Sequence, residues 1–261
     1  MLIIYFAAAL LATALGGMTG MGGGVIIKPV LDMLGHFDVA SISLLSSATV
    51  FVMSAVSLLK QQKSPDKPSV SMVVPLAAGA AAGGILGNML LNTLISSNAD
   101  TSRITVRQNI TLAALVLAIL VYMQLKHKLP SPGLSGIAPS ALTGLFLGAV
   151  SSFLGIGGGP INVSAIIYIF GLTTKSAAIC SLLIILFSQS ARLLTTALGG
   201  GFGSYDLSML PVMLAGAVIG GYIGGVILGR VSAKTADTLF NSAQAVVLCM
   251  CAVNIVRNWS V

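Results

Sequence analysis

A glycine-rich break interrupts the apolar sequence twice, at matching places in the two halves of the chain. The copies are Gly20–Gly24 (GMGGG) and Gly155–Gly159 (GIGGG), and their starts are 135 residues apart (155 − 20). Each copy follows an apolar, helix-like stretch and precedes a short apolar segment. Because an unpaired backbone amide in lipid costs several kcal/mol, broken backbone survives there only inside protein or beside a water-filled cavity. A paired break is therefore typical of the substrate site of a membrane transporter.

The amount of apolar sequence indicates a membrane protein. Hydrophobic residues make up 56% of the 261 residues and charged residues only 7%, whereas soluble domains carry roughly 25% charged residues. A bilayer core about 30 Å thick requires roughly 20 apolar residues for each crossing helix. Eight long segments reach or nearly reach this length: 2–18, 39–59, 70–92, 108–125, 137–154, 175–198, 208–229 and 237–256. We expect an all-α, multi-pass protein of the cell's inner (plasma) membrane, in one integral domain.

The repeat extends beyond the breaks. Four glycines recur 137 residues later (216 − 79, 220 − 83, 221 − 84, 224 − 87): Gly79, Gly83, Gly84 and Gly87 correspond to Gly216, Gly220, Gly221 and Gly224. Small residues at four-residue spacing let membrane helices approach closely, so these glycines are interpreted as packing residues. The sequence predicts a first transmembrane repeat over 1–125, a linker over 126–136 and a second transmembrane repeat over 137–261.

The positive-inside rule bears on the orientation of the two repeats. In an inverted layout, seven basic residues lie inside: Lys60, Lys63, Lys67, Lys126, Lys128, Arg230 and Lys234. Three then lie outside: Arg103, Arg107 and Arg257. A parallel layout gives six inside and four outside. The count favours inverted repeats.

The segments after the breaks, 25–35 and 160–171, are too short to cross the membrane. At a rise of 1.5 Å per residue they reach only ~18 Å, so we interpret them as half-helices. The first amides of a helix lack intrahelical partners and carry the positive end of its dipole. Two such N-termini converging near mid-membrane form an anion site. Six glycines are the resulting candidates for substrate binding: Gly22, Gly23, Gly24, Gly157, Gly158 and Gly159. The alternative is that they only kink helices and pack.

Polar residues near the breaks extend this candidate site. Asn162 follows a Gly-Gly-Gly-Pro turn, where its amide can cap the half-helix or reach a substrate. Thr19 and Ser152 supply hydroxyl groups, although serine and threonine in membrane helices often bond their own backbone.

Three ionisable residues lie in the apolar parts, where such groups are costly and usually functional. Lys28 and Asp32 are four residues apart on the first half-helix, close enough to interact. They either form a self-neutralising pair, or Lys28 attracts the anion and Asp32 carries a coupling proton. Arg192 lies deep in the segment 175–198. A substrate oxyanion suits its guanidinium, and the alternative is that the side chain extends to the membrane interface.

The residues around the second break carry a family resemblance. The stretch Gly148–Pro160, together with the first break and the glycine-rich segments after Pro75 and Pro211, resembles the sulfite exporter TauE/SafE family of membrane permeases. The resemblance covers nearly the whole chain. It implies transport, commonly outward, of a small anion such as sulfite, thiosulfate or an organosulfonate. The first break departs from the pattern, because its half-helix has no counterpart of Asn162.

The leading hypothesis is a secondary transporter, an exporter of a small anion bound between the two half-helix N-termini. The alternatives are a cation- or proton-coupled permease for another organic anion such as a carboxylate, a cation carrier using Asp32, and a non-transporting membrane scaffold. An enzyme is not expected, because the chain has no glutamate and few candidates for acid–base catalysis. No cofactor and no metal are expected. The expected partners are the anionic substrate and the lipid bilayer, with a homodimer left open. The net charge of +7 is scattered over short loops and does not indicate nucleic acid.

Overall fold

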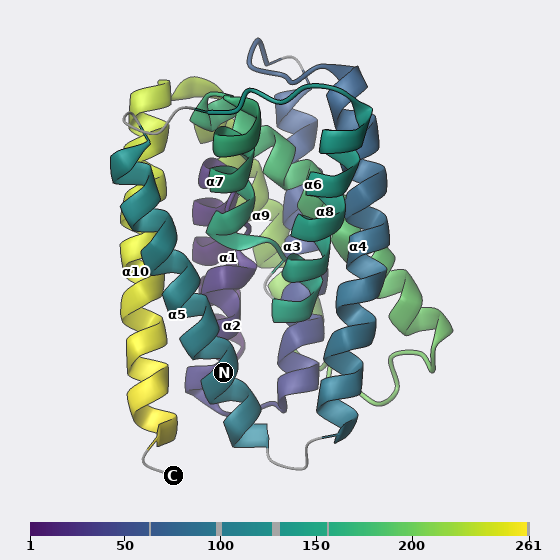
Figure 1. The fold of residues 1–261 in the computed structure, drawn as a ribbon. Helices are drawn as coiled ribbons and strands as arrows, with labels where there is room; N and C mark the ends of the chain where they lie inside the picture. Colours follow the sequence, from purple (N-terminus) through teal and green to yellow (C-terminus); the bar gives the residue numbers. More distant parts are fainter. Residues whose placement is uncertain (63, 98–100, 127–130, 156, 260–261) are drawn as a thin grey trace.

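Helices form nearly all of the described chain in this computed structural model (Figure 1). It describes residues 1–62, 64–97, 101–126, 131–155 and 157–259, with side chains except those of 94–97, 101–109 and 257–259. The helices are α1 Leu2–Thr19, α2 Gly24–Leu34, α3 Val39–Gln61, α4 Val70–Ser97, α5 Thr101–Leu125, α6 Ile137–Leu154, α7 Gly159–Phe170, α8 Thr174–Leu198, α9 Leu210–Arg230 and α10 Ala233–Trp259. The expected all-α architecture is confirmed for these residues.

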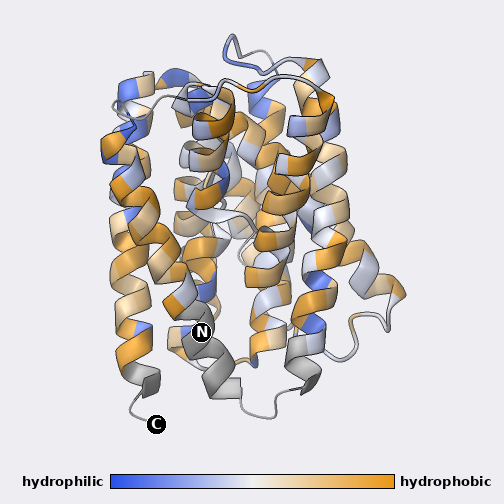
Figure 2. Cartoon of the chain, viewed as in Figure 1, coloured by the Kyte–Doolittle hydropathy of each residue, from blue (hydrophilic) through white to orange (hydrophobic). Residues whose placement is uncertain are grey.

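Seven of the described helices are long and apolar enough to cross a membrane: α1, α3, α4, α6, α8, α9 and α10. The predicted segment 108–125 falls in α5, whose described apolar part, Ile110–Leu125, is shorter than such a span. The count of eight therefore stays a prediction. Figure 2 shows apolar residues along the outer helices and hydrophilic residues gathered at one end of the bundle, drawn uppermost. Burial is greatest in α3 and α8, which form the centre.

The two half-helices begin and end at glycine. α2 has 11 residues and α7 has 12, within one residue of the predicted bounds at either end. Each ends at a left-handed glycine, Gly35 (φ 69°) or Gly171 (φ 66°), whose amide donates to a carbonyl in the last turn. Each also returns toward the end where the preceding helix began. The Tyr5 hydroxyl hydrogen-bonds His36 Nδ1 at 2.7 Å, and the Ser131 hydroxyl donates to the Tyr168 carbonyl at 2.7 Å.

Polar contacts define the two ends of the bundle. At the upper end in Figure 1, Lys175 pairs with Asp66 at 2.9 Å and Lys126 pairs with Asp237 at 2.7 Å. The start of α8, the α3–α4 loop, the end of α5 and the start of α10 therefore lie together. At the lower end, the Asp206 amide donates to the Ser41 hydroxyl at 2.9 Å, which brings the α8–α9 loop to the start of α3.

The glycine-rich helices pack across the repeats rather than within them. α4 of the first repeat lies against α6 of the second, and α9 of the second lies against α1 of the first. A Cβ on Gly83 would overlap the Leu145 carbonyl oxygen, and a Cβ on Gly220 would lie 2.5 Å from the Leu10 carbonyl oxygen. These glycines therefore act in close backbone packing, as their spacing indicates.

Replacement of Gly83 by alanine is expected to destabilise the protein by about 3 kcal/mol, because the new methyl group meets backbone that cannot rotate away. The midpoint of thermal unfolding in detergent measures the effect. Gly203→Ala is the matched control, since nothing lies within 4 Å of the Cβ it adds. An unchanged midpoint for Gly83→Ala would contradict the close packing of α4 on α6.

Candidate functional site

The two glycine breaks meet inside the protein. A Cβ built on Gly22 would lie 3.0 Å from the Gly157 carbonyl oxygen, so the backbones of the breaks approach closely. Gly22 (φ 75°), Gly157 (φ 68°) and Gly158 (φ 119°) have left-handed backbone that side chains rarely adopt. Only glycine allows both this geometry and this approach. The breaks begin the half-helices at one buried place, as the sequence predicts.

Each break rests on the long central helix of the other repeat. Gly20 and Gly22 of the first break touch Ala178 and Ile185 on α8. Gly155 and Gly157 of the second touch Ser43 and Val50 on α3. The touched residues are themselves related by the repeat offset of 135 (178 − 43, 185 − 50). Corresponding contacts therefore occur on the two sides of the site.

Arg192 lies at the second break and does not extend to an interface. Its residue is only 4% exposed, and its Nη1 lies 3.5 Å from the Cβ position of Gly155. Its three nitrogens donate to neutral oxygens contributed by α3 and α4: Nη1 to Ser47 at 2.7 Å, Nη2 to Ser43 at 2.7 Å and Nε to Asn88 at 3.2 Å. No carboxylate pairs with this guanidinium among the described residues.

A buried guanidinium without a counter-ion is costly in a membrane. It carries five N–H donors in a planar fork, and three are engaged in the hydrogen bonds above. The remaining two can receive an oxyanion in a bidentate way. The neutral contacts hold the fork in place without cancelling its charge, so this part of the site favours an anion.

Lys28 adds a second buried cation near the first break. It lies on α2 and is 3% exposed. Its ammonium group is attracted by the charge of Asp32 on the same half-helix and repelled by the charge of Arg192 on α8. Asp32 lies one turn further along α2, partly exposed, and its charge also reaches Cys251 on α10. Two cations and one acid thus share the region between the breaks and α10.

Several buried polar atoms around the breaks have no hydrogen-bond partner. Asn162 is fully buried on α7; its Oδ1 accepts from Ser151 at 3.5 Å, and its Nδ2 is unpartnered. Three further buried atoms also have no hydrogen-bond partner: the hydroxyl oxygens of Ser46 and Ser152 and the Gln189 Oε1. Since buried polar groups are nearly always hydrogen-bonded, such a group calls for water or a ligand. Donors from α3, α6 and α7 therefore accompany Arg192.

Thr19 is placed differently from the other candidates. Its hydroxyl donates to the Leu15 carbonyl at 2.7 Å and accepts from the Met21 amide at 3.4 Å. Both bonds stabilise the end of α1, so this side chain belongs to the scaffold of the first break. Gly23 likewise serves that scaffold, because a Cβ there would lie 3.0 Å from the Ala12 carbonyl oxygen, and Gly24 is the first residue of α2.

Two polar side chains were not among the sequence candidates. Asn88 on α4 binds Arg192 and also donates to Thr195 at 3.1 Å. Gln244 lies midway along α10 with an exposed fraction of 0%, and neither its Oε1 nor its Nε2 has a hydrogen-bond partner. In both cases an amide inside an apolar span was the available signal.

One of three comparisons with known proteins gave a match. No curated protein and no solved structure matched the chain. The described residues contain no group of three metal-ligating side chains. The family model of the sulfite exporter TauE/SafE matches residues 5–255, nearly the whole chain. The chain therefore belongs to the sulfite exporter TauE/SafE family of membrane transporters.

Proposed function

We propose that the protein is a secondary transporter that exports a small anion, with a sulfur oxyanion or an organosulfonate as its substrate class. The observation that carries the proposal is Arg192, buried at the second break with neutral partners and two N–H donors available. Substrate binds where Arg192, Asn162 and Ser152 converge on the glycine backbone. Membership of a sulfite exporter family supports the sulfur chemistry.

The donor set suits an anion with three oxygens on one centre. Arg192 engages two oxygens through its planar fork, and the unpartnered Asn162 Nδ2 and the Ser152 hydroxyl are donors for the third. A carboxylate bound in the plane of the guanidinium fork has no third oxygen to direct toward Asn162 and Ser152, so it leaves these donors without a partner. A desolvated, unpaired donor costs about 1–3 kcal/mol, which favours sulfite or a sulfonate over a carboxylate.

Inverted repeats are part of the proposal. The first repeat begins beside His36 at the lower end, whereas the second begins beside Tyr168 at the upper end. The upper end carries Lys60, Lys67, Lys126, Lys175, Arg230 and Lys234, which supports a cytoplasmic position. Lys63 and Lys128, also assigned inside, lie outside the described residues. Because α4 packs on α6 and α9 packs on α1, alternating access then moves groups of helices drawn from both repeats around the breaks.

Asp32 is the proposed coupling group. It lies near the lower end of α2 and is partly exposed. Its negative charge attracts the ammonium group of Lys28, and the positive charge of Arg192 repels that same group. α10 lines this region with polar atoms: Asn254 donates to the Pro29 carbonyl at 3.0 Å, and Gln244 lies further up the same helix. Protonation of Asp32 removes a negative charge and so increases the net positive charge around the anion. Binding of a proton and binding of the anion therefore favour each other.

Asp32→Asn is expected to abolish transport driven by a pH gradient while leaving anion exchange intact, because the amide cannot gain or lose a proton. Proteoliposomes loaded with unlabelled anion measure the exchange, and an imposed pH gradient measures the driven flux. Asp38→Asn is the matched control: Asp38 is an exposed N-cap six residues away. Full retention of the pH-driven flux in Asp32→Asn would reject proton coupling through this residue.

The substrate class is tested by thermal stabilisation of the purified protein. A ligand that binds only the folded state raises stability by about 2.7 kcal/mol at 100 times its dissociation constant. Sulfite, thiosulfate and short sulfonates are expected to raise the unfolding midpoint, and acetate and sodium are expected to raise it little. Stabilisation by carboxylates alone, or absence of anion flux in proteoliposomes, would overturn the proposal.

A further inference from the structure

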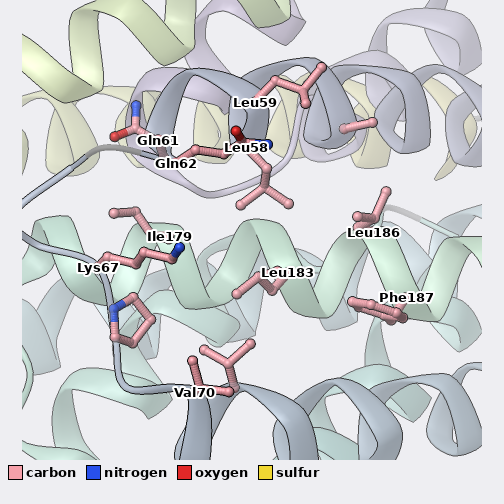
Figure 3. Close-up of a pocket in the computed structure, with 13 residues that line it drawn as sticks. Leu58, Leu59, Gln61, Gln62, Lys67, Val70, Ile179, Leu183, Leu186 and Phe187 are labelled. Atoms are coloured by element: carbon pink, nitrogen blue, oxygen red, sulfur yellow. The ribbon is translucent and has the colours of Figure 1, made fainter.

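A pocket of about 450 Å³ opens between α3, α8 and the start of α4 (Figure 3). On α8 it is lined by Ile179, Leu183 and Leu186. Ala178 and Ile185 on the neighbouring face of α8 contact the first break instead. The pocket is thus separate from the candidate substrate site, although the same two central helices form both.

The walls of this pocket are apolar, and its rim faces lipid. The exposed fractions of Leu59, Val70 and Phe187 are 62%, 70% and 39%. In a helix bundle that spans a membrane, large exposed apolar side chains are solvated by acyl chains. An occupant entering between them therefore has an apolar part that is continuous with the bilayer.

One end of the pocket is polar and positively charged. Figure 3 shows the Lys67 side chain lying along Ile179, with its ammonium group directed into the pocket. The adjacent Asp66 pairs with Lys175 at 2.9 Å and not with Lys67. Gln61 lies at the same end, but its side-chain amide is directed away from the pocket and toward α9, where its Nε2 donates to the Gly225 carbonyl at 2.5 Å.

We propose that this pocket binds an anionic phospholipid, such as phosphatidylglycerol. One acyl chain fills the groove between α3 and α8, and the phosphate pairs with Lys67. The position suits a lipid of the leaflet at the upper end, where the basic residues gather. The proposal does not depend on which substrate the protein carries.

Native mass spectrometry of the purified protein, titrated with phosphatidylglycerol or phosphatidylcholine of identical acyl chains, tests the site. We expect the wild type to prefer phosphatidylglycerol about five-fold, the factor that corresponds to one lysine near an anionic surface. Lys67→Gln is expected to remove this preference while the acyl chain still binds. Leu183→Trp fills the pocket and is expected to weaken binding of both lipids.

Two control variants separate the pocket from general surface effects. Lys234→Gln removes an exposed charge at the same end of the bundle, and Leu142→Trp enlarges an exposed apolar residue on α6. Both are expected to bind lipid as the wild type does. An equal preference for phosphatidylglycerol in Lys67→Gln, or an equal loss in Lys234→Gln, would overturn the proposal. Lys67 is exposed, so its variant remains informative if Leu183→Trp fails to fold.

Discussion

Arg192→Gln is expected to lower anion affinity ~100-fold and to abolish measurable flux at substrate concentrations that saturate the wild type. Two hydrogen bonds from a charged fork to an anion, at about 1.5–3 kcal/mol each, account for a loss of this size. Arg192→Lys keeps the charge but presents no planar pair of donors, so its affinity is expected to fall about ten-fold. Isothermal titration and proteoliposome uptake measure the two quantities.

A purely structural role for Arg192 gives a different result. The ligand-free protein carries this charge without a described counter-ion, so glutamine is expected to leave its unfolding temperature unchanged or raise it. Loss of binding together with retained stability identifies a substrate contact. Arg230→Gln, at the exposed end of α9, is the matched control and is expected to transport normally. Equal losses of stability and flux in Arg192→Gln would contradict the assignment.

Gly157→Ala is expected to stop transport, because it changes the second break in two ways. Its φ of 68° is unfavourable for alanine by roughly 1–2 kcal/mol. The added methyl group also overlaps Cγ2 of Val50 on α3, which forces the break away from its supporting helix. A displacement of the backbone there moves the Gly155 region, where Arg192 lies. Uptake into proteoliposomes at matched protein density measures the effect.

A second substitution separates the two causes. Val50→Ala removes the methyl groups that the new Cβ meets, so the pair Gly157→Ala with Val50→Ala is expected to regain part of the flux. The backbone strain at residue 157 stays, and full recovery is not expected. No rescue at all would show that the contact with α3 is unimportant. Gly203→Ala, in open space in the α8–α9 loop, is expected to leave transport unchanged.

The fold could be predicted from the sequence where local rules decide it. Apolar length identified seven of the eight predicted segments as candidate spans. The half-helices followed because glycine begins and ends them within one residue of the observed bounds. The Gly83 and Gly220 spacing correctly indicated close packing. It did not reveal the partner helices, because small-residue spacing specifies how near a helix comes and not which one it meets.

The candidate site was predictable only in part. Local chemistry singled out Arg192 and Asn162, since charged and amide groups are rare in apolar spans. The side chains that hold Arg192 are 104 to 149 residues away along the chain, and no local pattern encodes such contacts. The burial of Gln244 could not be predicted for a related reason, because it depends on helices of both repeats that pack around α10.

The exchange of packing partners between the repeats has a consequence for biosynthesis. α1 meets its glycine partner only when α9 has been made, and α9 begins 191 residues after α1 ends (210 − 19). At roughly 5–20 residues per second, synthesis of that stretch takes about 10–40 s. During this interval the grooves of α1 contact lipid or the insertion machinery. Separately expressed halves are therefore expected to become protease-resistant only when both are present in one membrane.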